Sequence, residues 1–259
     1  MKARIINHLQ EIESDENVIV FYACESGSRA WGFPSMDSDY DVRFLYLHPI
    51  QWYLSILEKR DVLERSLDNQ LDINGWDLKK ALGLFRKSNP PLLEWLGSPI
   101  IYQEKFTITS QMRELAKTYY SPTACIYHYL HMAQGNFREY LKGERVWLKK
   151  YFYVLRPILA IKWIEMGYGV APTSFGILLE QIVSPSALKT AIEDLVKQKS
   201  AGAELSYGDR IPVISEFIEK ELARLEENSK QYENNSPPVD VLDNLFRQSF
   251  NEVWKVRLE

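Results

Sequence analysis

The sequence has little of what marks several large protein classes. Its 259 residues include two cysteines, Cys24 and Cys125, which are far apart and too few for a disulfide-rich secreted domain. No stretch approaches the roughly 18 uninterrupted apolar residues of a membrane-spanning helix, and no signal peptide is recognisable. We therefore expect a cytoplasmic protein in which both cysteines are inert core residues.

An excess of positive charge is also missing. The chain has 31 lysines and arginines against 35 aspartates and glutamates, which gives a formal net charge of −4. This balance excludes a generally basic nucleic-acid-binding protein but leaves room for a local basic groove. With 46% hydrophobic and 25% charged residues, the composition is that of an ordinary globular protein, and the length suffices for one large or two modest domains.

One stretch near the N-terminus concentrates the residues that carry chemistry. Residues 18–23 form an apolar run that predicts a buried strand, and the Gly27-Ser28 turn follows it. Residues 39–47 predict a second strand, on which Asp39 and Asp41 project from the same face. Two carboxylates about 6–7 Å apart along a strand can hold a divalent cation, and a Gly-Ser turn offers N–H groups and a hydroxyl to a phosphate. The stretch therefore predicts a site for a metal ion and a phosphate.

The order of these elements resembles the DNA polymerase β-type nucleotidyltransferase superfamily, in which a Gly-Ser turn and a variable spacer precede an Asp-x-Asp strand. The more specific matches are Gly27-Ser28-Arg29-Ala30-Trp31-Gly32, Asp37-Ser38-Asp39-Tyr40-Asp41-Val42-Arg43, Gly75-Trp76-Asp77-Leu78 and Ser88-Asn89-Pro90. Together they resemble predicted nucleotidyltransferases whose relatives include proteins associated with RNA repair. The resemblance implies an enzyme that uses Mg²⁺, with Mn²⁺ as the alternative. It would move a nucleoside monophosphate from a nucleoside triphosphate (NTP) to an acceptor hydroxyl and release pyrophosphate.

The superfamily usually has a third carboxylate on a neighbouring strand, and two aspartates compete for that place. Residues 61–75 predict a hairpin in which Asp72 faces opposite to its apolar neighbours. Asp77 lies at the predicted start of a helix, where a carboxylate has an ordinary capping role. We favour Asp72 as the catalytic and metal-binding partner of Asp39 and Asp41, although the sequence leaves the choice between Asp72 and Asp77 open.

The resemblance also implies residues that hold the triphosphate. The Gly-Ser turn would bind the β- and γ-phosphates, and a helix after the catalytic domain would supply cations. Residues 145–157 predict that helix, with three of its residues at i, i+4 and i+7 on one face. A solvated basic face beside an aromatic core stripe is the alternative interpretation. The expected nucleotide-binding residues are Gly27, Ser28, Arg29, Lys149, Lys150, Tyr153 and Arg156.

The predicted fold class is α+β with two domains. From about residue 107 the pattern changes to helix after helix, and residues 202–208 read as a polar connector. We expect a polymerase-β-like nucleotidyltransferase domain over residues 1–115, in which helices flank a mixed sheet. An all-helical bundle over residues 116–259 would close the nucleotide and substrate cleft.

Three functional classes follow from these observations. The first is nucleotidyl transfer to an RNA end, the second is the same chemistry on a protein or small molecule, and the third is a non-catalytic nucleotide-binding regulator. An RNA path needs a basic strip. Its candidates are Lys142, Arg145, Lys149, Lys150 and Lys162, interrupted by Glu139, Glu144 and Glu165. The sequence leaves the acceptor and the oligomeric state open.

Overall fold

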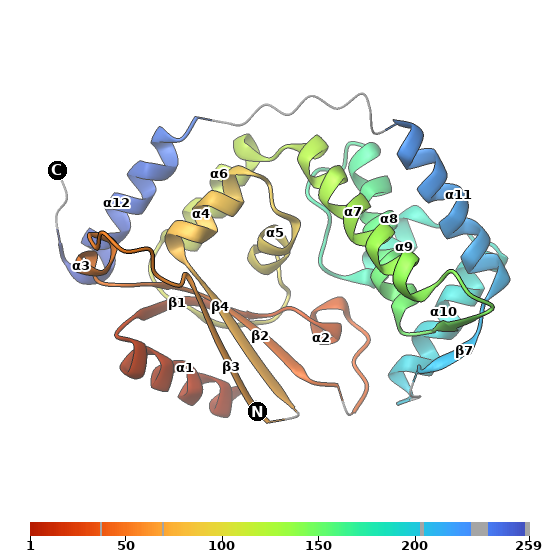
Figure 1. Ribbon diagram of the computed structural model, residues 1–259, viewed down its shortest axis with the longest axis horizontal. Helices are drawn as coiled ribbons and strands as arrows, with labels where there is room; N and C mark the ends of the chain where they lie inside the picture. Colours follow the sequence, from red (N-terminus) through yellow and green to blue (C-terminus); the bar gives the residue numbers. More distant parts are fainter. Residues whose placement is uncertain (37, 69, 203–204, 229–237, 257–259) are drawn as a thin grey trace. The chain divides into compact units, whose positions relative to one another are not determined.

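The computed structural model describes residues 1–36, 38–68, 70–202, 205–228 and 238–256. Asp37 of the motif and Asn69 of the predicted hairpin turn therefore lie outside the described residues. The α+β class is confirmed, because a five-stranded mixed sheet with flanking helices is followed by a mostly helical part (Figure 1).

The chain divides into two units. Unit 1 comprises Met1–Ala30, Asp39–Tyr120 and Ser236–Glu259, and unit 2 comprises Trp31–Ser38 and Ser121–Asn235. The division after Tyr120 lies near the expected domain boundary. The C-terminal helix, however, groups with the sheet rather than with the helical part.

Unit 1 is built on one sheet with the strand order β3-β4-β2-β1-β5, in which β2 and β4 are parallel and the other pairs antiparallel. Its elements are α1 (Lys2–Glu16), β1 (Ile19–Glu25), β2 (Tyr40–Leu47), α3 (Ile50–Tyr53), β3 (Val62–Asp68), β4 (Leu71–Asp77), α4 (Leu78–Arg86), α5 (Pro90–Leu96), β5 (Ile101–Glu104), α6 (Ile108–Tyr119) and α12 (Asp240–Trp254). The short helix α2 (Ser28–Trp31) begins in unit 1 and ends in unit 2.

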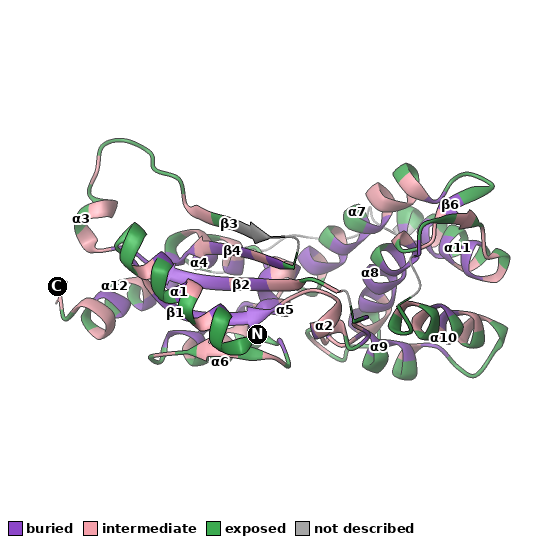
Figure 2. Ribbon diagram, turned by 90° about the horizontal axis from the view of Figure 1, so that it is seen from below, coloured by how far each residue is buried: buried purple, intermediate pink, exposed green. Residues whose placement is uncertain are grey.

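Residue alternation in β2 decides which side chains face each side of the sheet. Val42, Phe44 and Tyr46 are buried in a core that also contains the apolar side chains of α1. Figure 1 shows α1 on one side of the sheet and α4 and α5 on the other. Because successive strand residues point to opposite faces, Asp41 and Arg43 lie on the side away from α1. The fold thus keeps the polar residues of β2 out of this core, although β1 and most of β2 are buried (Figure 2).

Unit 2 is organised around a helix that is buried on nearly all sides. This helix, α8 (Lys150–Glu165), includes Arg156 and Pro157 among its buried residues. Such all-round burial is typical of a central core helix. The elements of unit 2 are α7 (Pro122–Tyr140), β6 (Arg145–Trp147), α8 (Lys150–Glu165), α9 (Phe175–Ile182), α10 (Ala187–Ser200), β7 (Tyr207–Asp209) and α11 (Pro212–Asn228).

The prediction of a helix over residues 145–157 is wrong at its start. Residues 145–147 form β6, which pairs with β7, and α8 begins only at Lys150. Strand β7 covers Tyr207–Asp209. It therefore overlaps the end of residues 202–208, which were expected to form a polar connector. Trp147 and Tyr207 are cross-strand partners, and their stacked rings have centroids 5.9 Å apart. Strands of three residues are too short to show the alternation by which a sequence reveals them.

Two further expectations concern membranes and cysteines. Within the described part of the chain, no helix combines the length and apolar character needed to cross a membrane. Cys24 and Cys125 are both buried, and neither forms a disulfide. Burial raises the pKa of the Cys24 thiol to about 12, which disfavours its reactive thiolate form.

Candidate active site

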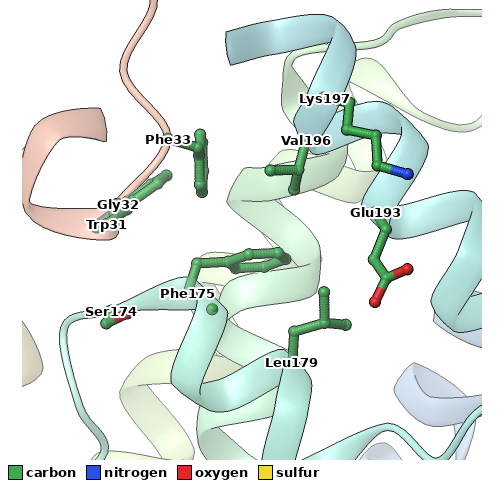
Figure 3. A pocket seen from close by; sticks show the side chains of 10 residues that line it. Trp31, Gly32, Phe33, Ser174, Phe175, Leu179, Glu193, Val196 and Lys197 are labelled. Atoms are coloured by element: carbon green, nitrogen blue, oxygen red, sulfur yellow. The ribbon is translucent and has the colours of Figure 1, made fainter.

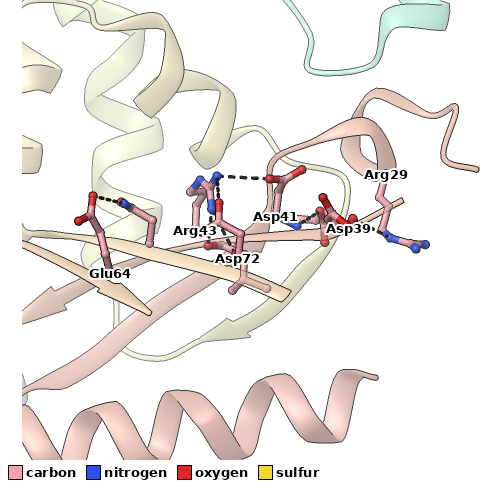
Figure 4. A network of polar contacts seen from close by, with 9 residues as sticks. Arg29, Asp39, Asp41, Arg43, Glu64 and Asp72 are labelled. Atoms are coloured by element: carbon pink, nitrogen blue, oxygen red, sulfur yellow. Dashed lines mark hydrogen bonds and ion pairs between the residues drawn. The ribbon is translucent and has the colours of Figure 1, made fainter. Parts of the chain in front are cut away.

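Two of the predicted carboxylates lie side by side on neighbouring strands. Asp41 of β2 is the direct register partner of Asp72 in the parallel strand β4. The Arg43 guanidinium joins them, because Nη2 donates to Asp72 Oδ2 at 2.8 Å and to Asp41 Oδ1 at 3.4 Å (Figure 4). The Arg43 side chain is mostly buried, so the two carboxylates are held by a cation that is itself fixed in position.

Asp39 is placed differently from the other two. It precedes β2 and is exposed, and its backbone carbonyl accepts a hydrogen bond of 3.3 Å from Arg29 Nε. The Arg29 guanidinium also lies 3.7 Å from the ring centroid of Tyr40. Within the described residues, no three His, Cys, Asp or Glu side chains are gathered closely enough to hold a metal ion. The structure therefore brings Asp41 and Asp72 together directly, whereas Asp39, expected on the same strand face, lies just before β2 and outside it.

Gly27 fits against the Asp41 side chain. A Cβ atom added at Gly27 would lie 1.7 Å from Asp41 Oδ2, so any larger residue would overlap the carboxylate. One residue before Gly27, the Ser26 N–H donates a hydrogen bond of 2.9 Å to the Asp41 carbonyl. Helix α2 starts immediately after Gly27, at Ser28. The Gly-Ser turn and the Asp-x-Asp strand thus touch at Asp41.

Glu25 is a site residue whose role was not inferred from the sequence. Its side chain is fully buried and accepts hydrogen bonds from the Asp41 N–H, at 2.8 Å, and from the Tyr102 hydroxyl. Burial raises the pKa of the Glu25 carboxyl above its ordinary value. The Glu25 side chain therefore holds the backbone N–H of Asp41 in position through this hydrogen bond. The signal available in the sequence was an acidic residue directly at the end of a buried apolar strand.

Asp77 lies at the opposite end of β4 from Asp72 and has a structural role. Its carboxylate accepts a hydrogen bond from the Lys79 N–H and so caps α4. The Tyr53 hydroxyl donates a second hydrogen bond to the same carboxylate, which is 1% exposed. These contacts match the capping interpretation of Asp77, and they leave Asp72 as the carboxylate beside Asp41.

Replacing Asp77 with asparagine should change how stability depends on pH. Burial raises the pKa of Asp77 from 3.8 to about 6, so its favourable contribution is complete below about pH 4 and is lost as the pH rises through 6. Two pH units correspond to about 3 kcal/mol. Asparagine keeps the cap without titrating. In urea unfolding from pH 4 to 7, the wild type should lose about 3 kcal/mol relative to Asp77→Asn. Parallel stability curves would contradict the shifted pKa.

The expected nucleotide-binding residues of unit 2 differ in their surroundings. Lys149 is exposed just before α8, and the Lys150 ammonium lies 4.2 to 5.5 Å from the ring centroids of Tyr140, Tyr153 and Trp147. Arg156 is 2% exposed and donates hydrogen bonds to the carbonyls of residues 172 and 173. Arg156 therefore stabilises the segment before α9 and does not belong to a solvated basic face.

The oxygen donors of the three aspartates are of the type that a hard divalent cation prefers. Asp39, Asp41 and Asp72 offer carboxylate oxygens, the ligand type that Mg²⁺ prefers, without a thiolate or imidazole in the set. In the structure the Arg43 guanidinium offsets the mutual repulsion of Asp41 and Asp72. The chemistry of these residues is therefore compatible with the Mg²⁺ that the sequence resemblance implies.

Comparisons with known proteins bear on the family of this chain. The model of the RNA repair pathway DNA polymerase beta family, RlaP, matches residues 1–248. The chain is 48% identical over 256 residues to "Uncharacterized protein YcgL" of Bacillus subtilis (strain 168), covering 98% of each protein. A crystal structure of a nucleotidyltransferase-like protein from Exiguobacterium sibiricum 255-15 aligns with 93% of this chain and 78% of its own, at a TM-score of 0.30 and 12% identity.

Proposed function

The chain belongs to the RNA repair pathway DNA polymerase beta family, and from this premise we propose that it is a Mg²⁺-dependent nucleotidyltransferase acting on an RNA end. The acceptor hydroxyl attacks the α-phosphorus of an NTP, the bond from the α-phosphorus to the bridging oxygen breaks, and pyrophosphate leaves. The observation that supports this most is the meeting of Gly27, Asp41 and Asp72 at one point of the sheet.

The proposed roles follow from the surroundings of each residue. Asp39, Asp41 and Asp72 would hold Mg²⁺, or Mn²⁺ as the alternative, which when bound offsets negative charge on the phosphate oxygens. The Asp72 carboxylate is about half exposed and accepts the proton of the acceptor hydroxyl. Arg43 positions Asp41 and Asp72 through its two hydrogen bonds, and Glu25 positions the Asp41 backbone.

The phosphates are proposed to bind at the Gly-Ser turn. Ser28 offers its hydroxyl, and the N–H groups of residues 27 and 28 precede the rest of α2. Arg29 adds a guanidinium beside this turn, where a planar donor fork suits a phosphate. The close fit of Gly27 against Asp41 keeps this turn next to the carboxylates.

The proposal is tested by following each labelled NTP with Mg²⁺ in three separate acceptor pools: RNA, protein and small metabolites. Label should enter RNA, and pyrophosphate should appear in equal amount, because one is released for each nucleotide transferred. Label found only in the protein pool or only in the metabolite pool would identify that pool, instead of RNA, as the source of the acceptor. No transfer into any pool would favour the non-catalytic regulator.

We also propose that Lys149 and Lys150 bind the triphosphate. A charge-assisted hydrogen bond contributes about 1.5–3 kcal/mol, so Lys149→Ala or Lys150→Ala should weaken NTP affinity about ten- to hundred-fold. Lys162→Ala is the matched control, because this lysine of α8 is paired with Glu221 at 3.0 Å. Calorimetric titration checks all three variants. Unchanged dissociation constants for both Lys149→Ala and Lys150→Ala would mean that these lysines belong to a solvated surface and do not bind the triphosphate.

A further inference from the structure

Unit 2 contains a cavity of about 260 Å³ between α9, α10 and the segment after α2 (Figure 3). Its walls are mainly aromatic and aliphatic, with two charged residues from α10. The lining residues include Trp31, Phe33, Phe175, Leu179, Glu193 and Val196. Small-molecule pockets usually measure roughly 300–1,000 Å³, so this one suits a single planar heterocycle rather than a larger ligand.

The aromatic wall is fixed by packing. Phe33 lies 4.6 Å from Phe152 and 5.5 Å from Phe175, measured between ring centroids. Phe33 and Phe175 are both buried, whereas Val196 is half-buried, and Figure 3 shows Phe33 and Val196 facing one another. A flat ring entering between them would meet preformed surfaces, which reduces the entropy cost of binding.

Glu193 is the polar residue that sets the chemistry of the cavity. The lysines one turn before and after it on α10 are paired elsewhere, Lys189 with Glu180 at 2.8 Å and Lys197 with Asp194 at 3.3 Å. With the residues that the structure describes, the Glu193 carboxylate makes no hydrogen bond or ion pair. A carboxylate beside an apolar cavity is thus available to accept hydrogen bonds from a ligand.

We propose that this cavity binds a guanine base, with Glu193 accepting hydrogen bonds from its N1–H and N2–H groups. Guanine alone among the four RNA bases presents two adjacent donors on its Watson–Crick edge, and a carboxylate with two oxygens matches them. Adenine and cytosine place an acceptor beside their amino group, and uracil places its single N–H between two carbonyls. A base face on Phe175 or Phe33 would add stacking.

This inference rests on the proposed function in taking a nucleotide as the ligand. Helix α2 carries Ser28 at its start and Trp31, a wall of the cavity, at its end. The same guanine chemistry has two sources, the incoming NTP and the terminal nucleotide of the RNA. Nucleoside binding measures the cavity without catalysis, and substrate preference then tells the two sources apart.

The test titrates the intact protein with guanosine, adenosine, cytidine and uridine by calorimetry. Guanosine should bind tightest, and Glu193→Gln should weaken it about ten- to hundred-fold, because two charge-assisted hydrogen bonds are replaced. The glutamine amide offers one donor and one acceptor, so its preference should move toward adenosine. Glu216→Gln, which changes an exposed carboxylate of α11 outside the cavity lining, should leave guanosine affinity unchanged.

A second variant tests the cavity itself. Val196→Phe fills the space with a larger side chain at a half-buried position and should remove guanosine binding while the thermal unfolding midpoint stays close to wild type. Equal affinity for all four nucleosides, or guanosine affinity unaffected by both Glu193→Gln and Val196→Phe, overturns the proposal. A Glu193→Gln shift from GTP to ATP as the substrate assigns the base to the NTP, and a shift only among RNA ends assigns it to the acceptor. Guanosine binding without any transfer would instead count against the proposed function alone.

Discussion

Replacing Asp41 with asparagine is expected to lower Mg²⁺-dependent nucleotide transfer by at least about a hundred- to a thousand-fold, the size of effect seen when one preorganised electrostatic group is lost from an active site. Asp41 is in contact with Gly27 of the Gly-Ser turn, is in register with Asp72 and accepts a hydrogen bond from Arg43, so it adjoins three parts of the proposed site. Transfer of labelled nucleotide to RNA measures the loss.

The folded protein should tolerate this change. Asp41 is one-third exposed, and its hydrogen bond with Arg43 is long at 3.4 Å, whereas Arg43 keeps its shorter bond to Asp72. The thermal midpoint should therefore move little, and Asp39→Asn should behave in the same way. Asp61→Asn is the control, because this carboxylate of unit 1 pairs with Lys80 away from the site. An Asp41→Asn or Asp39→Asn enzyme that keeps half its activity contradicts the metal-ligand proposal for that residue.

Strands β1 and β2 show how much of the structure could be predicted from the sequence. The apolar run and the alternation after it predicted both strands, because local periodicity follows directly from which faces are buried. The neighbouring relation of Asp41 and Asp72 needed more, since it depends on a parallel pairing between segments thirty residues apart that no local pattern specifies. The alternation of β4 favoured Asp72, and the register placed it beside Asp41.

Other features depended on tertiary context that the sequence does not express. Arg156 was expected to bind the triphosphate, with a solvated basic face as the alternative, but its side chain is buried against backbone carbonyls of the segment before α9. In the sequence, Glu193 is one acid among several in the helical half of the chain, and only the packing of α9 and residue 33 against α10 makes it a cavity residue. Propensity and spacing identify elements, whereas burial decides what a charged side chain does.

Replacing Gly27 with alanine is expected to reduce activity about as much as losing the Asp41 carboxylate. The backbone at Gly27 is not left-handed, so alanine is allowed there, and the obstacle is the Asp41 carboxylate at 1.7 Å from the new Cβ. Either the carboxylate or the turn must move by an ångström or more, and a displacement of about 1 Å can cost roughly a hundred-fold in rate. Gly83→Ala is the control, since nothing lies within 4 Å of its added Cβ.

A double-mutant cycle on stability shows whether the two residues act through this one contact. In the wild-type background Gly27→Ala should destabilise unit 1 by about 1–3 kcal/mol, the usual cost of overpacking. In the Asp41→Ala background most of that cost should disappear, because the overlapping carboxylate is gone. Urea unfolding of the four proteins gives a coupling energy of about 1–3 kcal/mol if the contact is as described. Additive effects would mean that Gly27 acts on the turn alone, and that the Gly-Ser turn and the aspartate strand are not fitted to one another.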